Sequence, residues 1–317
     1  MLIFLSESLR EQELRAPLAP RVRDALLNLS TAAYEGKHLV TGSRQLFGEL
    51  IQLASLGPAA TGRFRDASAL ITDAQALRQS VSAYIRVHPV GREPRVELDG
   101  PASQIVFNLP IDHFSDSEHV ASSRLMGENL RDAVAYVALG EARASQFRGF
   151  FCVLKGVEGH GGGTPQAFRV LAEQDAVVLC LVDSDQTDPS ASLGRTATDA
   201  LDCHDLMRAL GKVATVHLLP CRELENLLPR SLVLDALPKD PKNAHRVRVW
   251  AEQHKLGLVD FVDLKHLVHL QDVSDHLATL TAHKRAELCF AGNVHPALEE
   301  AGTLIWSFGL ASRRGRT

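Results

Sequence analysis

Apolar residues in the first eighty positions recur with the spacing of helices. Two apolar faces fall within residues 20–56, the first made of Val22, Ala25, Leu26 and Leu29 and the second of Leu46, Leu50, Ile51 and Leu53. A third helix is expected over residues 68–82. Pro and Gly then interrupt short β-branched runs, and strands are expected over 83–88 and 104–109. The pattern predicts an α-rich N-terminal domain with short strands over residues 1–117.

From residue 124 the pattern changes to alternating strands and helices. Apolar runs predict strands at 124–129, 149–157, 176–185 and 212–220, and helical periodicity predicts helices at 130–144, 164–174 and 197–211. Alternation of this length predicts an α/β core with a parallel sheet and right-handed crossovers, over residues 118–230. The remaining residues, 231–317, have a mostly helical pattern and end in a basic tail.

Composition narrows the class of protein. The chain has 317 residues with 45% hydrophobic and 23% charged residues, which is typical of a globular protein of two domains or of one domain with large additions. Its formal net charge is -4, so a polyanionic partner would need a local patch or metal ions. No segment approaches the roughly 20 apolar residues of a membrane span, and the first apolar run is too short for a signal peptide. Five cysteines without a CxxC pair are typical of reduced thiols, so a cytoplasmic protein without a zinc site is expected.

Acidic residues follow three of the expected strands. Glu128 follows the first strand, Asp183 and Asp185 follow the third, and Glu223 and Glu225 follow the fourth. Ligands of parallel α/β sheets bind beyond the carboxyl ends of the strands. A single acid there is usually a helix cap or a turn residue, but three sets at one sheet edge favour a shared role. Clustered carboxylates repel one another, and Mg²⁺ or Mn²⁺ relieves that repulsion while holding phosphate oxygens. The spacing therefore predicts a metal site for phosphoryl transfer.

The first of these segments resembles a known motif. In ENLRDA, Glu128 ends a strand and Asp132 follows four positions later, as in the first motif of Toprim domains. Asn129 stands where family members usually have Gly. The pair Asp183 and Asp185 matches the DxD motif of the same domains, and 55 residues separate Asp183 from Glu128. That interval holds the helix–strand–helix that the family places there, so the resemblance implies a Toprim-type, Rossmann-like core.

Within this superfamily the chain is most similar to OLD-type nucleases. These proteins carry a further Glu, often beside Asn, after the next strand, and a downstream Lys; Glu225-Asn226 and Lys265 are the matching positions. If residues 223–225 are extended, Glu223 and Glu225 point to opposite faces, and the Glu-Asn pairing then favours Glu225. The resemblance covers about residues 118–270. OLD proteins also carry an ATPase domain, whereas this chain has no GxxxxGK[ST] motif, so ATP is either not used or handled by a separate protein.

The resemblance implies a role for each site residue. Asp183, Asp185 and Glu225, with Glu223 as a further candidate, would hold Mg²⁺ or Mn²⁺. Glu128 would hold a metal ion or deprotonate the attacking water, with Asp132 supporting it, and Lys265 would stabilise charge on the phosphate. The implied activity is hydrolysis of DNA or RNA, in the context of bacterial defence against phage. A partner ATPase or other defence protein and a homo-oligomer are the expected assemblies.

One loop is an alternative candidate for the functional site. Glu158-Gly159 resembles the Toprim Glu-Gly pair, but only 25 residues separate Glu158 from Asp183, which is room for one helix and one strand. Residues 149–163 are therefore interpreted as the second strand and its turn, with His160 as a turn residue. Gly161, Gly162 and Gly163 could let backbone amides approach a phosphate. The favoured alternative is a tight turn with Thr164 as helix N-cap and Pro165 at the first helical position.

Two other functions remain open. The core could be a nucleic-acid or nucleotide-binding module without cleavage activity. It could also serve primer synthesis or strand passage, but strand passage needs a tyrosine nucleophile. The three tyrosines, at positions 34, 84 and 136, fall in expected helices or strands.

Overall fold

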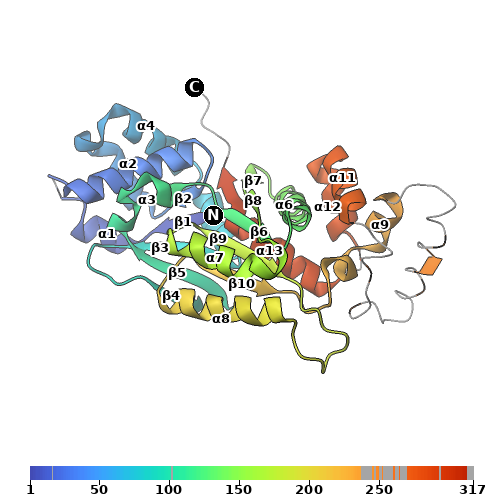
Figure 1. Ribbon diagram of the computed structural model, residues 1–317. Helices are drawn as coiled ribbons and strands as arrows, with labels where there is room; N and C mark the ends of the chain where they lie inside the picture. Colours follow the sequence, from blue (N-terminus) through green and yellow to red (C-terminus); the bar gives the residue numbers. More distant parts are fainter. Residues whose placement is uncertain are drawn as a thin grey trace.

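Two sheets, one from each half of the chain, form the framework of the computed structural model (Figure 1). The structure describes residues 1–15, 17–100, 103–236, 245, 248–249, 252, 260, 264, 270–292 and 294–312. The strands of both sheets are parallel apart from one edge strand, and helices pack against them. The chain therefore has a mixed α/β fold with a parallel-sheet core.

The first sheet has five strands in the order β2-β1-β3-β5-β4. Their bounds are β1 (Leu2–Leu5), β2 (Leu39–Thr41), β3 (Ala83–His88), β4 (Arg95–Asp99) and β5 (Gln104–Pro110). Strands β3 and β5 confirm the two predicted strands, whereas the sequence pattern did not indicate the other three. β1 lies between β2 and β3 and is almost wholly buried. A strand that is covered on both faces needs apolar residues throughout, as its sequence LIFL shows. β2 has only three residues, too few to show a period.

Helices α1 to α5 accompany this sheet. The N-terminal part is therefore rich in helix, as expected, but it is an α/β unit built on a sheet of its own. The helix bounds are α1 (Glu7–Gln12), α2 (Pro20–Tyr34), α3 (Arg44–Gln52), α4 (Gly57–Ser68) and α5 (Ile71–Arg78). Helices α2 and α3 carry the two predicted apolar faces, and β2 lies between them. The helix expected over 68–82 is shorter, and α4 precedes it without a clear sequence signal. The polar junction after residue 110 contains two short 3₁₀ helices, η2 (Ile111–Ser115) and η3 (Ser117–Val120).

The second sheet has four parallel strands in the order β10-β9-β6-β8. The bounds are β6 (Arg124–Gly127), α6 (Leu130–Ala144), β8 (Lys155–Glu158), α7 (Thr164–Glu173), β9 (Val178–Val182), α8 (Arg195–Ala209) and β10 (Ala214–Leu218). This confirms the predicted alternation. The predicted strand at 149–157 is in fact two strands. Its first part, β7 (Phe150–Cys152), pairs with β11 (Leu310–Ser312) near the end of the chain, and only β8 joins the sheet.

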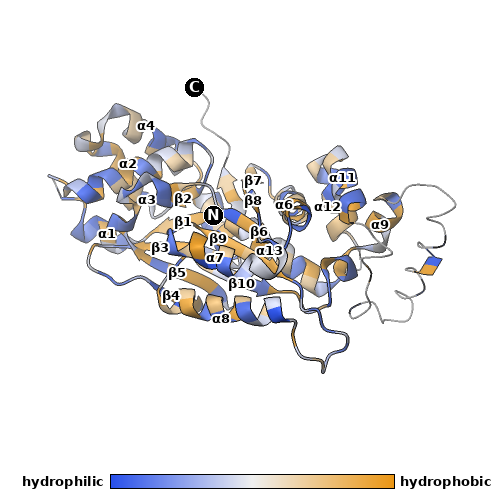
Figure 2. Cartoon of the chain, viewed as in Figure 1, coloured by the Kyte–Doolittle hydropathy of each residue, from blue (hydrophilic) through white to orange (hydrophobic). Residues whose placement is uncertain are grey.

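Both faces of the second sheet are covered, which explains the strong apolar signal of β9. Leu179 and Leu181 belong to the hydrophobic cluster shared with α6 on one face. Val178, Cys180 and Val182 belong to a separate cluster with α7 and α8 on the other. A strand buried on both faces needs apolar residues at every position. Figure 2 shows this distribution, with apolar strands in the interior and mixed surfaces on helices such as α8.

The last long helix, α13 (Pro296–Gly309), connects the two sheets. Ser307 Oγ accepts a hydrogen bond of 2.9 Å from the backbone amide of Ser82, beside the first sheet. The ring of Phe308 packs edge-on against Phe107 of β5, with 6.0 Å between ring centroids. On the side of the second sheet, a Cβ added at Gly140 of α6 would lie 2.6 Å from Ile305 Cγ2, so the two helices are in close contact. The C-terminal region thus completes a core shared by both sheets.

The described part of the C-terminal region contains three further helices, α9 (Arg230–Ala236), α11 (Leu270–Thr279) and α12 (Ala282–Phe290). They confirm the helical prediction for the described part of residues 231–317, although β11 was not indicated. None of the helices in the described residues is both long enough and apolar enough to span a membrane.

Candidate carboxylate site at the strand ends

The sheet order brings the first two predicted acids together. Strand β6 lies beside β9, with Met126 opposite Cys180. Glu128 therefore emerges next to the end of β9, and its Oε1 accepts a hydrogen bond of 3.4 Å from the backbone amide of Asp183. Gly127 makes this turn possible, because a Cβ there would lie 2.7 Å from the backbone nitrogen of Ala133.

Asn129 and Asp132 form the N-terminal cap of α6. Asn129 Oδ1 accepts hydrogen bonds from the amides of Arg131 and Asp132, at 2.9 and 3.1 Å. Asp132 Oδ2 in turn accepts from the backbone amide and the side-chain Nδ2 of Asn129, at 3.3 and 2.7 Å. Such a reciprocal cap holds the entry of a helix in one conformation. The Asn that departs from the Toprim pattern thus has a structural role, and Asp132 orients the turn that carries Glu128.

The Asp183–Asp185 segment lies against the chain that follows β10. The amide of Leu219 donates to the carbonyl of Val182 at 3.0 Å, and the amide of Asp185 donates to the carbonyl of Arg222 at 3.1 Å. The Ser184 hydroxyl is fully buried and donates to the carbonyl of Cys221 at 2.6 Å. The two segments therefore run together beyond the end of the sheet, and the second of them leads directly into the third set of acids.

Asp185 lies in space beside the N-terminus of α8, although it comes well before that helix in the sequence. Its backbone is left-handed, with φ of 55°, and its side chain is exposed. Gly194, the N-cap of α8, is in contact with it, because an added Cβ would lie 2.8 Å from Asp185 Cβ and 2.6 Å from Oδ2. The positive end of the helix dipole favours a carboxylate there. The sequence showed no reason to single out Gly194.

Gly194→Ala should destabilise the fold by about 1–3 kcal/mol, because the new methyl group would displace Asp185 from the start of α8. The measurement is the urea midpoint of unfolding. Gly48→Ala is the matched control. Gly48 lies inside α3 with no atom within 4 Å of an added Cβ, so this change should stabilise by roughly 0.5–1 kcal/mol. An unchanged midpoint for Gly194→Ala would contradict the contact with Asp185.

Glu223 and Glu225 are both buried in a helical turn. The segment forms the 3₁₀ helix η5 (Leu224–Leu227), so the argument from opposite faces of an extended chain does not apply. Glu223 caps this turn with Asn226, whose Oδ1 accepts from the Glu223 amide at 2.7 Å. Glu223 Oε2 also accepts a hydrogen bond of 3.3 Å from the amide of Leu264. Glu223 thus acts mainly in local structure, which leaves Glu225 as the stronger candidate ligand of the two.

Tyr136 lies among these acids, and the sequence patterns did not select it. It is buried in α6, one helical turn beyond Asp132. Burial raises the pKa of its hydroxyl well above 10, and the negative charges of Asp183, Asp132 and Glu225 raise that pKa further. Tyr136 is therefore within electrostatic reach of these three acids. Helical spacing from Asp132 is the signal that could have revealed it.

The donor chemistry of the site suits a hard cation. Among the described residues, no group of three or more His, Cys, Asp or Glu side chains stands ready to hold a metal ion. Glu128 and Asp183 nevertheless offer carboxylate oxygens at adjoining strand ends. Mg²⁺ is usually held by only one or two carboxylates, with water and phosphate oxygens completing its shell. The residues present therefore fit a divalent cation held in part by its substrate.

The rival loop occupies the other side of β6. Glu158 ends the edge strand β8 opposite Gly127, as the interpretation of residues 149–163 as the second strand requires. The amide of Gly161 donates to the carbonyl of Glu128 at 2.7 Å, and that of Gly163 to the carbonyl of His160 at 3.1 Å. His160 is an exposed, left-handed turn residue, as predicted. With two glycine amides used inside the turn, the tight-turn interpretation is favoured over phosphate binding.

The cap of the following helix differs from the prediction by one residue. Gly163, rather than Thr164, is the N-cap of α7, and Pro165 is the second residue of the helix rather than the first. Thr164 is already helical, and its hydroxyl donates to the carbonyl of Gly161 at 2.6 Å. An N-cap residue typically has a non-helical backbone, whereas Thr164 has φ of -51° and ψ of -46°, so it lies inside the helix. Lys265, the predicted phosphate contact, lies outside the described residues, so its role stays a prediction from the sequence.

A cleft of about 600 Å³ adjoins the Glu128 turn. Its lining includes Asn129, Leu130, Arg131 and Val134 from the start of α6, together with Glu158 at the end of β8 and Ser274 of α11. Leu130 and Val134 are 51% and 46% exposed, which is unusual for large apolar side chains on one helix face. The buried hydroxyl of Ser274 makes no hydrogen bond within the described part of the chain. The cleft thus combines an apolar wall, the positively charged side chain of Arg131 and the N-terminus of α6, and it lies beside the acids.

Comparisons of the chain with protein-family models, with curated proteins and with solved structures found no match.

Proposed function

We propose that the chain is a metal-dependent nuclease with a Toprim-like core of the OLD type. The observation that carries this proposal is the contact between Glu128 Oε1 and the Asp183 amide, made by acids 55 residues apart. The Asp183–Asp185 segment also runs along the chain that leads to Glu225. Acids brought together in this way from three strands suit phosphoryl transfer better than three unrelated helix caps.

Asp183 and Asp185, with Glu225 and more remotely Glu223, would hold Mg²⁺ or Mn²⁺. When bound, such an ion neutralises the charge of the phosphate and of the leaving oxygen. The protein contribution is the placement of the acids. The buried Ser184 hydroxyl and the cap of α6 fix the backbone of the two strand ends. The carboxylates of the described residues do not form a three-residue ligand group, so their side chains would have to turn toward the ion.

In the proposed reaction, a water oxygen attacks the phosphorus and the phosphodiester P–O bond to the leaving sugar oxygen breaks. The Glu128 carboxylate accepts the proton of the attacking water, as a general base. Asp132 does not touch the reacting atoms, because its Oδ2 is hydrogen-bonded to Asn129 and fixes the turn. Lys265 would stabilise the developing negative charge, as the resemblance implies.

The cleft beside Asn129 offers a path for the nucleic-acid strand. Arg131 is exposed in the first turn of α6, where its guanidinium and the positive end of the helix dipole attract phosphate. Leu130 and Val134 present an apolar surface on which a base could pack. Because the net charge of the chain is -4, this local arrangement would have to hold the substrate together with the metal ions.

Cleavage of DNA or RNA should require Mg²⁺ or Mn²⁺ and stop in EDTA. Calorimetric titration with Mn²⁺ should show binding to the wild-type chain, and Asp183→Asn should weaken it by roughly tenfold or more, because a charged ligand oxygen is lost. Asp188→Asn is the control, since Asp188 is exposed and its carboxylate bonds to the nearby residue Ser190 of the same loop. Full cleavage in EDTA would refute the metal mechanism. Metal-dependent binding of oligonucleotides without cleavage would instead support the alternative of a binding module.

Strand passage is disfavoured by the positions of the tyrosines. Tyr84 and Tyr136 are each 2% exposed, and neither can reach a DNA backbone without unfolding of its surroundings. Tyr34, in α2, belongs to the part of the chain that carries the first sheet. The context of phage defence, a separate ATPase partner and a homo-oligomer remain parts of the proposal that rest on the resemblance to OLD-type proteins.

A further inference from the structure

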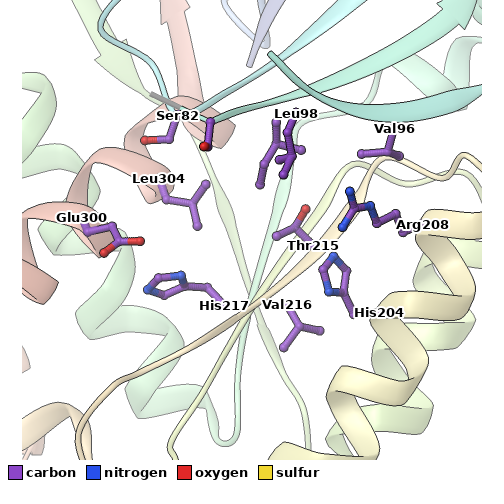
Figure 3. Close-up of a pocket in the computed structure, with 12 residues that line it drawn as sticks. Ser82, Val96, Leu98, His204, Arg208, Thr215, Val216, His217, Glu300 and Leu304 are labelled. Carbon is purple, nitrogen blue, oxygen red and sulfur yellow. The ribbon is translucent and has the colours of Figure 1, made fainter. Parts of the chain in front are cut away.

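A cavity of about 420 Å³ lies where the two sheets meet (Figure 3). Strands β4 and β5 of the first sheet form one wall, and β10, the edge strand of the second sheet, forms the opposite wall together with α8. Helix α13 closes one end. Cavities of a few hundred Å³ between domains or sheets are the commonest places for small ligands in proteins. Its walls share no residue with the carboxylate site.

Two buried polar atoms in the β10 wall make no hydrogen bond within the described residues. They are Thr215 Oγ1 and His217 Nε2. Thr215 is only 4% exposed, so its hydroxyl is cut off from bulk solvent. Leaving such a group unpaired costs about 1–3 kcal/mol. Both residues lie on one strand and both line this cavity, which points to a polar ligand that satisfies them.

The cavity has opposite charges at its two ends. Arg208 and His204 lie together at one end and Glu300 and His217 at the other, with Thr215 between them (Figure 3). Neither Arg208 nor Glu300 forms an ion pair among the described residues. Burial lowers the pKa of both His204 and His217, so at neutral pH they are uncharged hydrogen-bonding groups. Arg208 and Glu300 therefore define the charge pattern that a ligand meets.

Apolar side chains line the cavity between its two charged ends. Leu98 of β4 is 57% exposed, a high value for leucine, and it faces the cavity in Figure 3. Leu304 of α13 lines it as well. A ligand that fits this arrangement has an anionic group at one end, a group with N–H donors at the other and a flat or apolar body between them.

We propose that this cavity binds guanosine monophosphate, with its phosphate on Arg208 and the edge of its base on Glu300. The guanidinium fork of Arg matches two phosphate oxygens. A guanine base presents two adjacent N–H donors, which match the two oxygens of the Glu300 carboxylate. Thr215 and His217 then complete the polar contacts, and Leu98 and Leu304 pack against the base and sugar. The proposal is independent of nuclease activity.

Calorimetric titration of the full chain tests this, with EDTA present so that metal ions cannot hold the phosphate elsewhere. Guanosine monophosphate should bind, and Arg208→Gln should raise its Kd by roughly tenfold or more, since charge-assisted hydrogen bonds are lost. Arg195→Gln is the matched control on the same helix. Arg195 is 94% exposed and does not line the cavity, so its replacement should leave the Kd unchanged within about twofold.

Glu300→Gln tests the base end of the cavity. It should reduce the preference for guanosine monophosphate over uridine monophosphate, because an amide accepts from two N–H groups less well than a carboxylate. Both substituted positions are exposed, so the variants should fold, which circular dichroism can verify. Absence of binding to any nucleoside monophosphate would overturn the proposal. Equal affinity for inorganic phosphate, or unchanged affinity in Arg208→Gln, would overturn it too.

Discussion

Glu128→Gln should lower the turnover of metal-dependent cleavage by a factor on the order of 10² to 10⁴, the contribution typical of a general base. The amide side chain keeps an oxygen that can accept the hydrogen bond from the Asp183 backbone, which Glu128 Oε1 accepts at 3.4 Å. Only the charge and the proton-accepting ability are removed. The fold should therefore be retained, and single-turnover cleavage of a labelled oligonucleotide should show the loss.

Glu158→Gln is the matched control for this variant. Glu158 ends the neighbouring strand β8, in register with Gly127, and is exposed on the opposite side of β6 from Asp183. It also lines the cleft beside Asn129, so its replacement is expected to affect substrate binding rather than the chemical step. Most of the activity should remain in this variant. If Glu158→Gln abolished cleavage and Glu128→Gln did not, the catalytic edge would have been assigned to the wrong pair of strands. Loss of oligonucleotide binding in Glu128→Gln would indicate a binding role instead.

Phe308→Ala should cause a large loss of stability, about 3–5 kcal/mol. Phe308 is fully buried in α13 and packs edge-on against Phe107 of the first sheet. Truncation would leave a cavity at the point where the two sheets share their core. Differential scanning calorimetry should show a melting temperature lower by an amount on the order of 10 °C.

Leu206→Ala controls for the loss of an apolar side chain as such. Leu206 lies on α8 and is 44% exposed, so its truncation should change stability by no more than about 0.5 kcal/mol. Equal melting temperatures for Phe308→Ala and Leu206→Ala would show that α13 does not hold the sheets together. Two separate transitions in the Phe308 variant would show that each sheet has a core that unfolds by itself.

Much of the second sheet could be predicted because its signals are local. The helix predicted at 130–144 is α6 with the same bounds, and the apolar run before Asp183 is β9. Period and apolar content depend only on nearby residues and on whether a strand is covered on both faces. The first sheet was harder to predict, since β1 and β2 are too short to show alternation and the exposed β4 lacks an apolar run.

The candidate site was predictable in its acids and less so in their surroundings. Glu128 and Asp183 were selected by their positions after strands, and the parallel sheet places such positions at one edge. The turn at Glu223 and Glu225 could not be inferred, because a 3₁₀ helix of four residues leaves little pattern in a sequence. The absence of a three-residue metal group among the described residues likewise depends on side-chain directions that the sequence does not specify.

The sequence by itself determined which segments are strands or helices in the second half, and which acids follow them. Only the tertiary structure decided that β6 lies beside β9, so that Glu128 meets Asp183 rather than a more distant strand end. It also placed Tyr136 near the acids and Gly194 in contact with Asp185. In the same way, it packed α13 between the two sheets. The physical reason is that hydrophobic periodicity reports which face of an element is buried. The neighbour that buries it is chosen by packing between segments far apart in the chain.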